Sequence, residues 1–478
     1  MRLWKITLLL LYLLLALSAW GRVFVRWSLA DVPSAESLGV RELVVPSDAR
    51  SAALMESARN HGYHVYTNVS LKQASEAAES VTKNGLSGII LDPGEADPAQ
   101  VDESLRALRS RYPKLVFLLL DTNGKQPDMR GQTVTKREGI LEVSSPTAQP
   151  WIDSNLALVR FDQTFRPGQL PVYSFHWDLS DPLQREQGPS AEDYSLAVAE
   201  QGAFHADLVL DLHEKLQKDL LRNDQHAWAT WNRVKKYISF YSHTGDQPRP
   251  RANVAAVMSD METYYEAINL MARHNIPFRV LRPEDLTARN LNGLEMLVVF
   301  APMNVEAGKT IAEFAASGRN VVLVNLRGAY PWHSATPIRT GKRSVAYEFG
   351  KGRIVEFSGP ITEPEIFAQD VRRLMDRNKM LITLWNALTT LAVPYRRADS
   401  RETIVELVNY AQEPLDVQVQ VAGSFSSAQY DSPERGCCQS LKTTQRGGFT
   451  EFVVPELKIA GRIHLRPTAP RSDTTPQR

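Results

Sequence analysis

The chain has 478 residues, 43% hydrophobic and 23% charged, with 55 basic side chains against 54 acidic ones. This length exceeds what one hydrophobic core serves, and it predicts about three domains of roughly 150 residues each. The balanced charge lacks the basic excess of nucleic-acid binders, so we expect no nucleic-acid partner.

The N-terminus carries a targeting signal. Arg2 and Lys5 precede the apolar run ITLLLLYLLLALSAW at 6–20, which has the length of a signal-peptide core. We therefore expect an exported protein, periplasmic or associated with the cell envelope. Two alternatives stay open for residues 1–30: a cleaved signal peptide, or an uncleaved membrane anchor to which GRVFV at 21–25 adds apolar length. This segment is the only expected contact with a membrane.

From residue 37 to 243, short apolar runs alternate with amphipathic stretches, as in βα units around parallel strands. The predicted strands are 41–46, 63–69, 87–92, 114–121, 139–144, 156–162, 171–177 and 206–212. The predicted helices are 48–61, 71–84, 97–111 and 191–203. Eight strands in this length favour a (β/α)8-like barrel. An open α/β sheet is the alternative, because 122–138, 145–155 and 163–169 lack an obvious helix.

Polar side chains recur at the predicted strand ends, where the loops of a barrel gather them into one bowl. In chain order they are Tyr66, Asn68, Asp92, Glu95, Asp121, Arg160, His176, Trp177, Asp178, Asp211 and Glu214. Carboxylates beside aromatic rings suit glycosidic-bond cleavage, in which one acid protonates the leaving oxygen and another carboxylate attacks or activates water. Each aspartate also has a structural interpretation, because Asp is favoured in turns and as a helix N-cap.

A break containing Gly and Pro at 244–252 precedes a second α/β pattern at 252–377, which predicts a flavodoxin-like, doubly wound sheet. Its segments LEMLVVFAP, AASGRNVVLVN and GKGRIVEF resemble the class I glutamine amidotransferase-like domain of bacterial β-galactosidases of glycoside hydrolase family 42. In that family the domain serves trimerisation. This domain contains no cysteine, so we expect no thiol-dependent glutamine hydrolysis and a role in assembly, with a homo-oligomer left open.

The C-terminal third begins with an apolar run at 380–393, which we interpret as a helix. Alternating strands separated by turn residues then predict a small all-β sandwich at 400–467, and the polar, proline-rich stretch 468–478 predicts a disordered tail. The two cysteines of the chain, Cys437 and Cys438, fall in a predicted loop of this domain. Their adjacency argues against a disulfide framework and against C-x-x-C metal sites, so we expect no metal.

In chain order, an export signal, a barrel, an amidotransferase-like domain and a sandwich resemble a glycoside hydrolase related to the β-galactosidase arrangement. The resemblance implies hydrolysis of an O-glycosidic bond in a carbohydrate, without a cofactor. Many retaining glycosidase barrels place the acid/base and the nucleophile after the fourth and seventh strands. On our strand count these positions are Asp121 and Asp178, where the family usually has glutamate.

The remaining candidates divide into two groups. The reserve catalytic carboxylates are Asp92, Glu95 and Asp211. The predicted substrate-binding residues are Tyr66, Asn68, Arg160, His176, Trp177 and Glu214. The alternative function is that of a non-catalytic envelope protein whose barrel binds carbohydrate or a protein partner.

Overall fold

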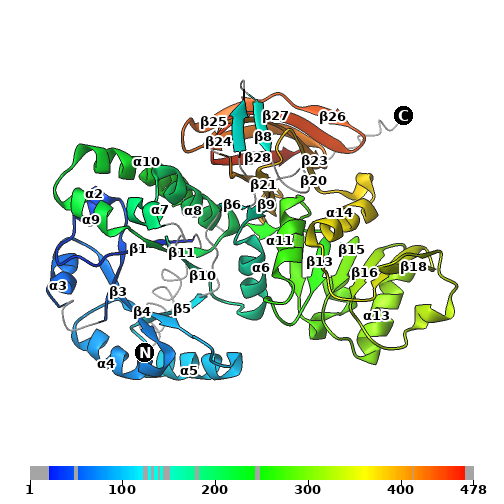
Figure 1. The fold of residues 1–478 in the computed structure, drawn as a ribbon, viewed down its shortest axis with the longest axis horizontal. Coiled ribbons are helices and arrows are strands. Elements are labelled where there is room, and N and C mark those ends of the chain that lie inside the picture. Colours follow the sequence, from blue (N-terminus) through cyan, green and yellow to red (C-terminus); the bar gives the residue numbers. More distant parts are fainter. Residues whose placement is uncertain are drawn as a thin grey trace, which may run out of the picture. The chain divides into compact units, whose positions relative to one another are not determined.

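The computed structural model describes residues 21–47, 52–121, 128–130, 134–137, 140–143, 151–177, 182–242, 248–411 and 413–468. It divides into two compact units. The first comprises residues up to 128 together with 153–247, and contains a barrel (Figure 1). The second comprises 129–152 together with 248 onward, and contains an α/β sheet and a β-sandwich.

In the described part of the first unit, seven parallel strands close a barrel in the order β1-β11-β10-β5-β4-β3-β2. They are β1 (Val23–Arg26), β2 (Glu42–Val45), β3 (His64–Ser70), β4 (Gly88–Asp92), β5 (Val116–Asp121), β10 (Val172–Phe175) and β11 (Asp207–Asp211). The predicted α/β barrel is confirmed, with seven strands here in place of the predicted eight. The predicted alternative of an open sheet is wrong, because β1 pairs with both β2 and β11.

Helices follow most of these strands. They are α2 (Ala35–Leu38), α3 (Ala52–Asn60), α4 (Ala74–Lys83), α5 (Pro98–Arg111), α6 (Leu156–Phe165), α7 (Pro182–Gln187), α8 (Ala191–Phe204), α9 (Glu214–Leu221) and α10 (Gln225–Tyr241). Local signals set their starts: Asp97 caps α5 with Pro98 at its first position, and Ser190 forms a capping box with Asp193 at α8. The four predicted helices are helical over their described residues, apart from a 3-10 turn at the start of the second.

Three predictions about the barrel are wrong. Residues 23–26, predicted as an extension of the leader, form the first barrel strand, so the barrel begins well before residue 37. Residues 156–162, predicted as a strand, lie in α6, in which six of ten residues are buried, so that this short apolar run could be taken for a buried strand. Residues 140–143 form β8 (Ile140–Val143), which pairs antiparallel with β7 (Val134–Arg137) outside the barrel. In a separate pair, β6 (Asp128–Arg130) joins β9 (Trp151–Asp153).

The barrel interior is filled by one apolar cluster: Phe24, Val44, Tyr66, Ile90, Leu118, Leu120, Val172 and Val209. Below it, at the amino ends of the strands, the buried carboxylate of Asp207 pairs with Arg22 at 2.8 Å. Because strand side chains alternate, residues two positions after the cluster members also point inward, at the carboxyl ends. The predicted leader core at 6–20 lies outside the described residues. Within them, no helix is both long and apolar enough to cross a membrane.

In the second unit, a sheet has the order β14-β13-β15-β16-β19-β18-β17, and its first five strands are parallel. They are β13 (Val254–Val257), β14 (Phe278–Leu281), β15 (Met296–Val299), β16 (Asn320–Val324) and β19 (Gly352–Phe357), with the hairpin β17 (Arg339–Thr340) and β18 (Ser344–Phe349) at one edge. This parallel order is that of flavodoxin-like sheets. Its helices are α11 (Tyr265–Arg273), α12 (Ala288–Leu291), α13 (Val305–Ala316) and α14 (Pro364–Leu374), and α11 packs beside α14 (Figure 1).

The C-terminal sandwich has a six-stranded sheet, β12-β21-β22-β28-β24-β25, and a four-stranded sheet, β20-β23-β27-β26. The first comprises β12 (Arg249–Pro250), β21 (Thr390–Arg396), β22 (Thr403–Asn409), β24 (Phe425–Ser432), β25 (Gly436–Leu441) and β28 (Ala460–Pro467). The second comprises β20 (Ile382–Trp385), β23 (Leu415–Ala422), β26 (Thr444–Arg446) and β27 (Phe449–Leu457). The inner faces share a core that includes Val419, Phe452 and Ile463.

The predicted sandwich is confirmed, but its predicted start at residue 400 is too late. The run 380–393, interpreted as a helix, contains β20 and most of β21. Residues 386–389 connect them, with Asn386 at φ 57° and the N–H of Thr390 bonded to the carbonyl of Ala387. Cys437 and Cys438, predicted to lie in a loop, are in β25 and are bonded to each other. Part of the predicted linker at 244–252 is β12, which extends the six-stranded sheet beside β21.

Candidate functional site

The barrel mouth holds a connected group of polar side chains, which we call the mouth cluster: Arg26, Asn68, His176 and Asp211. Arg26 ends β1 two residues after Phe24, and Asp211 ends β11 two residues after Val209. Asn68 follows Tyr66 in β3 by the same interval. The alternation of each strand therefore carries the interior face upward from the apolar cluster to these polar groups.

Arg26 joins three strands. Its Nη1 donates to Oδ2 of Asp211 at 3.0 Å, and its Nη2 donates to Oδ1 of Asn68 at 3.2 Å. The Asn68 amide in turn donates to the carbonyl of Ile90 in β4 at 3.0 Å. The guanidinium thus fixes both an amide and a carboxylate in place, as its planar fork of donors allows.

Asp211 is the centre of the cluster. Its Oδ2 accepts from Arg26 and also contacts Nδ1 of His176, the residue directly after β10. Its Oδ1 is buried and has no hydrogen-bond partner among the described residues. A buried acceptor without a partner is costly, so this oxygen lacks the donor that its burial calls for. The His176 side chain is 52% exposed, so the imidazole can reach a molecule that enters the mouth.

The loops behind the cluster are held by buried polar groups. Oε1 of Gln217 accepts from the backbone N–H of Ser28 at 3.0 Å, and its Nε2 donates to the carbonyl of Leu212 at 2.6 Å. This one side chain therefore links the segments that follow β1 and β11. The hydroxyl of Tyr194 accepts from the backbone N–H of His213 at 2.9 Å, and burial raises the pKa of this phenol.

Comparison of the sequence with protein-family models and with curated proteins gives no match. Solved structures do match. An α-L-fucosidase, isoenzyme 2 from Paenibacillus thiaminolyticus, is 11% identical with a TM-score of 0.57, over 94% of this chain and 100% of that one. A β-galactosidase from Rahnella sp. R3 is 9% identical with a TM-score of 0.50, over 91% of this chain and 98% of that one. The chain has the fold of these glycosidases.

Three predicted substrate-binding residues lie away from the mouth cluster. Tyr66, predicted as a stacking surface, is 3% exposed and packs edge-on against Phe24 inside the barrel, so that role is wrong. Arg160, predicted at a strand end, is buried in α6 and donates to Gln163. Glu214 begins α9 as an exposed residue paired with Lys218, which lowers the pKa of its carboxyl.

The predicted catalytic carboxylates have different positions. Asp92 ends β4 half-buried, and its Oδ1 accepts from the N–H of Gly94 at 2.9 Å, while Glu95 is exposed in the loop that follows. Asp121 is the last residue of β5, and its side chain lies outside the described residues, as does all of Asp178. Trp177 is half-buried, 6.5 Å from Phe175 between ring centroids.

Our strand count is also corrected. Since β1 was assigned to the leader, the predicted strands up to 114–121 were numbered one too low, and the fourth barrel strand is β4, which ends at Asp92. Since 139–144 and 156–162 are not barrel strands, the last two predicted strands were numbered one too high. Asp121 ends the fifth strand, and Asp178 follows β10, the sixth described strand. On the corrected count, Asp121 and Asp178 therefore do not follow the fourth and seventh strands, which are the positions that the resemblance to the family suggested.

Arg26 is the residue that sequence reasoning missed. Its signal was present: the alternation in VFVR places Phe24 and Arg26 on one face, as in the other barrel strands that end in a polar residue. The one group in the described residues with metal-ligand spacing is Asp431, Cys437 and Cys438, in the sandwich. The two sulfurs are bonded to each other and Asp431 accepts from the N–H of Cys438, so this group does not offer thiolates.

Proposed function

We propose that the chain is a glycoside hydrolase that binds and cleaves a carbohydrate at the barrel mouth. The observation that carries the proposal is the buried, unpartnered Oδ1 of Asp211 in a carboxylate already held by Arg26 and His176. Sugars present many hydroxyl donors, and glycosidic cleavage needs a positioned carboxylate. The shared fold with a fucosidase and a β-galactosidase supports this class.

Asp211 is the proposed carboxylate that attacks the anomeric carbon or deprotonates water. Both donors engage its Oδ2, and Oδ1 is buried without a donor. The proton donor then comes from Asp92, Asp121 or Asp178, the other carboxylates at or after barrel strand ends. It transfers its proton to the leaving oxygen, and the elements of water are divided between the two products.

The other members of the mouth cluster are proposed to hold the sugar. The exposed imidazole of His176 faces hydroxyl groups, and Arg26 and Asn68 position Asp211 and the substrate. Trp177, beside His176, supplies an aromatic surface on which a sugar ring can stack.

The test is hydrolysis of a panel of aryl glycosides and oligosaccharides by residues 21–478 and by the Asp211→Asn variant. We expect kcat/KM to fall by at least about 10³-fold, because a carboxylate that reacts in the transition state is lost. Asp219→Asn, in α9 nearby, is the matched control and should keep full activity. The proton donor is identified by the loss of turnover in one of three further variants, Asp92→Asn, Asp121→Asn or Asp178→Asn. Turnover unchanged in Asp211→Asn would overturn the assignment.

A second candidate is a carbohydrate-binding barrel without catalysis. The observation that favours it is that the mouth cluster, in the described part of the chain, contains a single carboxylate, whereas cleavage commonly uses two. This candidate predicts oligosaccharide binding that Asp211→Asn abolishes, with no turnover on any member of the panel. Calorimetric binding beside the activity assay separates the two candidates.

We further propose that residues 1–20 direct export to the periplasm or cell envelope. The support is the sequence pattern of two basic residues followed by a 15-residue apolar run. Fractionation of cells that express the full chain, with mass spectrometry of the mature N-terminus, tests both export and cleavage. Protein retained in the cytosol would contradict the proposal.

A further inference from the structure

The outer face of the four-stranded sheet in the sandwich carries a second group of side chains suited to a ligand. β20, β23, β27 and β26 lie side by side, and their registered residues form rows across the sheet. One row is Trp385, Gln418 and Val453, and the next includes Gln420, Glu451 and Thr444. The intervening residues, such as Val419 and Phe452, point into the sandwich core, so these rows face outward.

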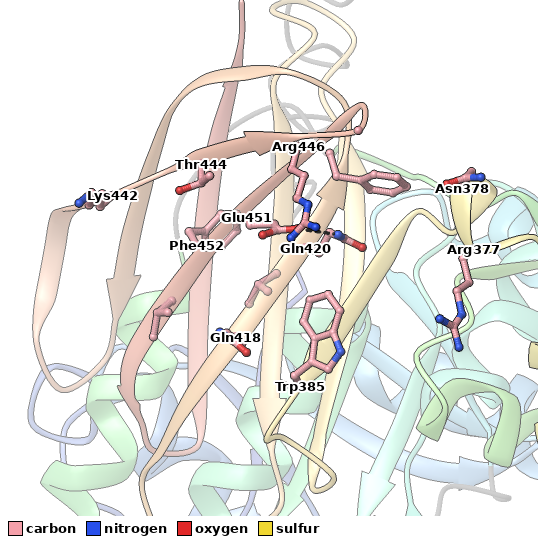
Figure 2. Close-up of a pocket in the computed structure, with 14 residues that line it drawn as sticks. Arg377, Asn378, Trp385, Gln418, Gln420, Lys442, Thr444, Arg446, Glu451 and Phe452 are labelled. Atoms are coloured by element: carbon pink, nitrogen blue, oxygen red, sulfur yellow. Dashed lines mark hydrogen bonds between the residues drawn. The ribbon is translucent and has the colours of Figure 1, made fainter.

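This face exposes apolar surface where an outer sheet face is usually polar. Trp385 is 42% exposed and Val453 is 47% exposed, and they lie on either side of Gln418. Figure 2 shows Trp385, Gln418, Gln420 and Arg446 on the same side of the sheet. They line a pocket of about 870 Å³. An indole on an open face, flanked by amide side chains, matches what a sugar ring requires: an apolar surface for its C–H face and donors and acceptors for its hydroxyls.

The charge at the pocket rim is positive. Arg377, Lys442 and Arg446 line it, against the single carboxylate of Glu451. In the described part of the chain none of these three cations forms an ion pair, and Glu451 already accepts a hydrogen bond from Gln420 at 2.8 Å. The whole chain has a formal net charge of only +1, so three unpaired cations around one pocket are a local departure from balance. Guanidinium and ammonium groups pair well with carboxylates and sulfates.

We propose that this sheet face is a second, non-catalytic binding site for an acidic polysaccharide, one whose sugar rings carry carboxylate or sulfate groups. Trp385 stacks on a ring, Gln418 and Thr444 bond its hydroxyls, and Arg446 with Lys442 neutralises its charge. The site lies on different strands from the barrel mouth and does not depend on hydrolysis. It would hold the chain on a polymer independently of cleavage.

The test is equilibrium binding of the full chain to three polymers. Polygalacturonate has sugar rings and charge, dextran has rings without charge, and poly-L-glutamate has charge without rings. We expect binding to polygalacturonate alone, weakened by added salt because the cations contribute. Equal binding to poly-L-glutamate would show that the surface recognises any polyanion and would overturn the proposal of a polysaccharide site. The absence of binding to polygalacturonate would overturn it as well.

Matched variants locate the site. Trp385→Ala and Arg446→Gln should each weaken binding at least about fivefold, consistent with the loss of a stacking or charge-assisted contact. Leu388→Ala, another exposed apolar side chain, and Lys458→Gln, another exposed cation, should leave binding unchanged. Asp211→Asn should also bind normally. Binding lost in Asp211→Asn but kept in Trp385→Ala would place the polymer at the barrel mouth and overturn the proposal while leaving the proposed hydrolase standing.

Discussion

Arg26 and Asp211 are 185 residues apart in sequence and form an ion pair at 3.0 Å across the seam where the first and last barrel strands meet. They are also registered neighbours in the pairing of β1 with β11. The bond that helps to close the barrel therefore also fixes the carboxylate at the centre of the mouth cluster. Arg26 is 27% exposed and Asp211 is 22% exposed in their side chains, so water screens this pair only partly.

The first prediction concerns this pair. Arg26→Met should lower kcat/KM at least about tenfold, because Asp211 loses a donor and Asn68 loses its contact with the guanidinium. Arg26→Lys should recover only part of this loss, since an ammonium lacks the planar fork that reaches both partners. A double-mutant cycle with Asp211→Asn measures the coupling, expected to be about 1–3 kcal/mol in transition-state stabilisation. Fully additive effects would contradict a shared role.

The second prediction concerns the N-terminus. Deletion of residues 1–20 should leave thermal stability unchanged, whereas deletion of residues 1–30 should abolish folding of the barrel. The longer deletion removes β1 and with it Phe24, Val25 and Trp27, all fully buried, and leaves β2 and β11 as unpaired edges. Circular dichroism melting of the two truncated proteins checks this. The same melting temperature in both would show that β1 is dispensable.

Much of the barrel could be predicted because its strands are short apolar runs that end in polar residues, as in the run that leads to Asp92 or to Asp211. The exceptions are short apolar runs that admit two interpretations. VFVR lies only two residues after the apolar leader and was assigned to it, and LALVRFD, which could be taken for a strand, belongs to a helix with six buried residues among its ten. The run 380–393 was likewise interpreted as one helix, although it contains two strands joined by residues 386–389, in which Asn386 has a positive φ.

The candidate site was predicted in part. Asn68, His176 and Asp211 were named from their positions at strand ends, and the structure brings these three together. Arg26 was missed because its strand was missed, although it provides the bonds that connect Asp211 to Asn68. Tyr66 was predicted at the rim because the sequence does not show how deep in the barrel a residue near a strand end lies. It precedes Asn68 by two residues, so it points inward like Asn68 but lies one layer deeper, in the barrel core.

The third prediction concerns the base of the barrel. Asp207→Ala should destabilise the first unit by about 3–5 kcal/mol, because it leaves the Arg22 guanidinium and the backbone N–H of Arg22 without their carboxylate partner. The matched control is Glu79→Ala, which breaks a pair with Arg111 in which both side chains are 62% exposed, and should cost less than about 1 kcal/mol. Urea unfolding of both variants measures the difference. Equal effects would mean that burial of Asp207 does not strengthen its pair.

The fourth prediction concerns pH and the sandwich. His464 lies between Glu402 at 3.3 Å and Asp431 at 3.5 Å, with Arg462 also nearby. Burial alone lowers the pKa of this imidazole, but its hydrogen bonds to the two carboxylates prevail and raise it from 6.5 to about 9. The folded state thus holds the proton more tightly than the unfolded state does, and the resulting stabilisation is of the order of 3 kcal/mol.

This stabilisation is fully present below about pH 6.5, declines as the pH rises, and is lost above about pH 9. His464→Gln removes the titrating group and keeps a polar side chain. The difference in melting temperature between the parent and this variant should therefore be largest at pH 6 and close to zero at pH 9.5, which differential scanning calorimetry can follow. His226→Gln, on the barrel helix α10, is the matched control substitution in the first unit. A constant difference across this range would mean that packing around His464, and not its charge between Glu402 and Asp431, supports the sandwich.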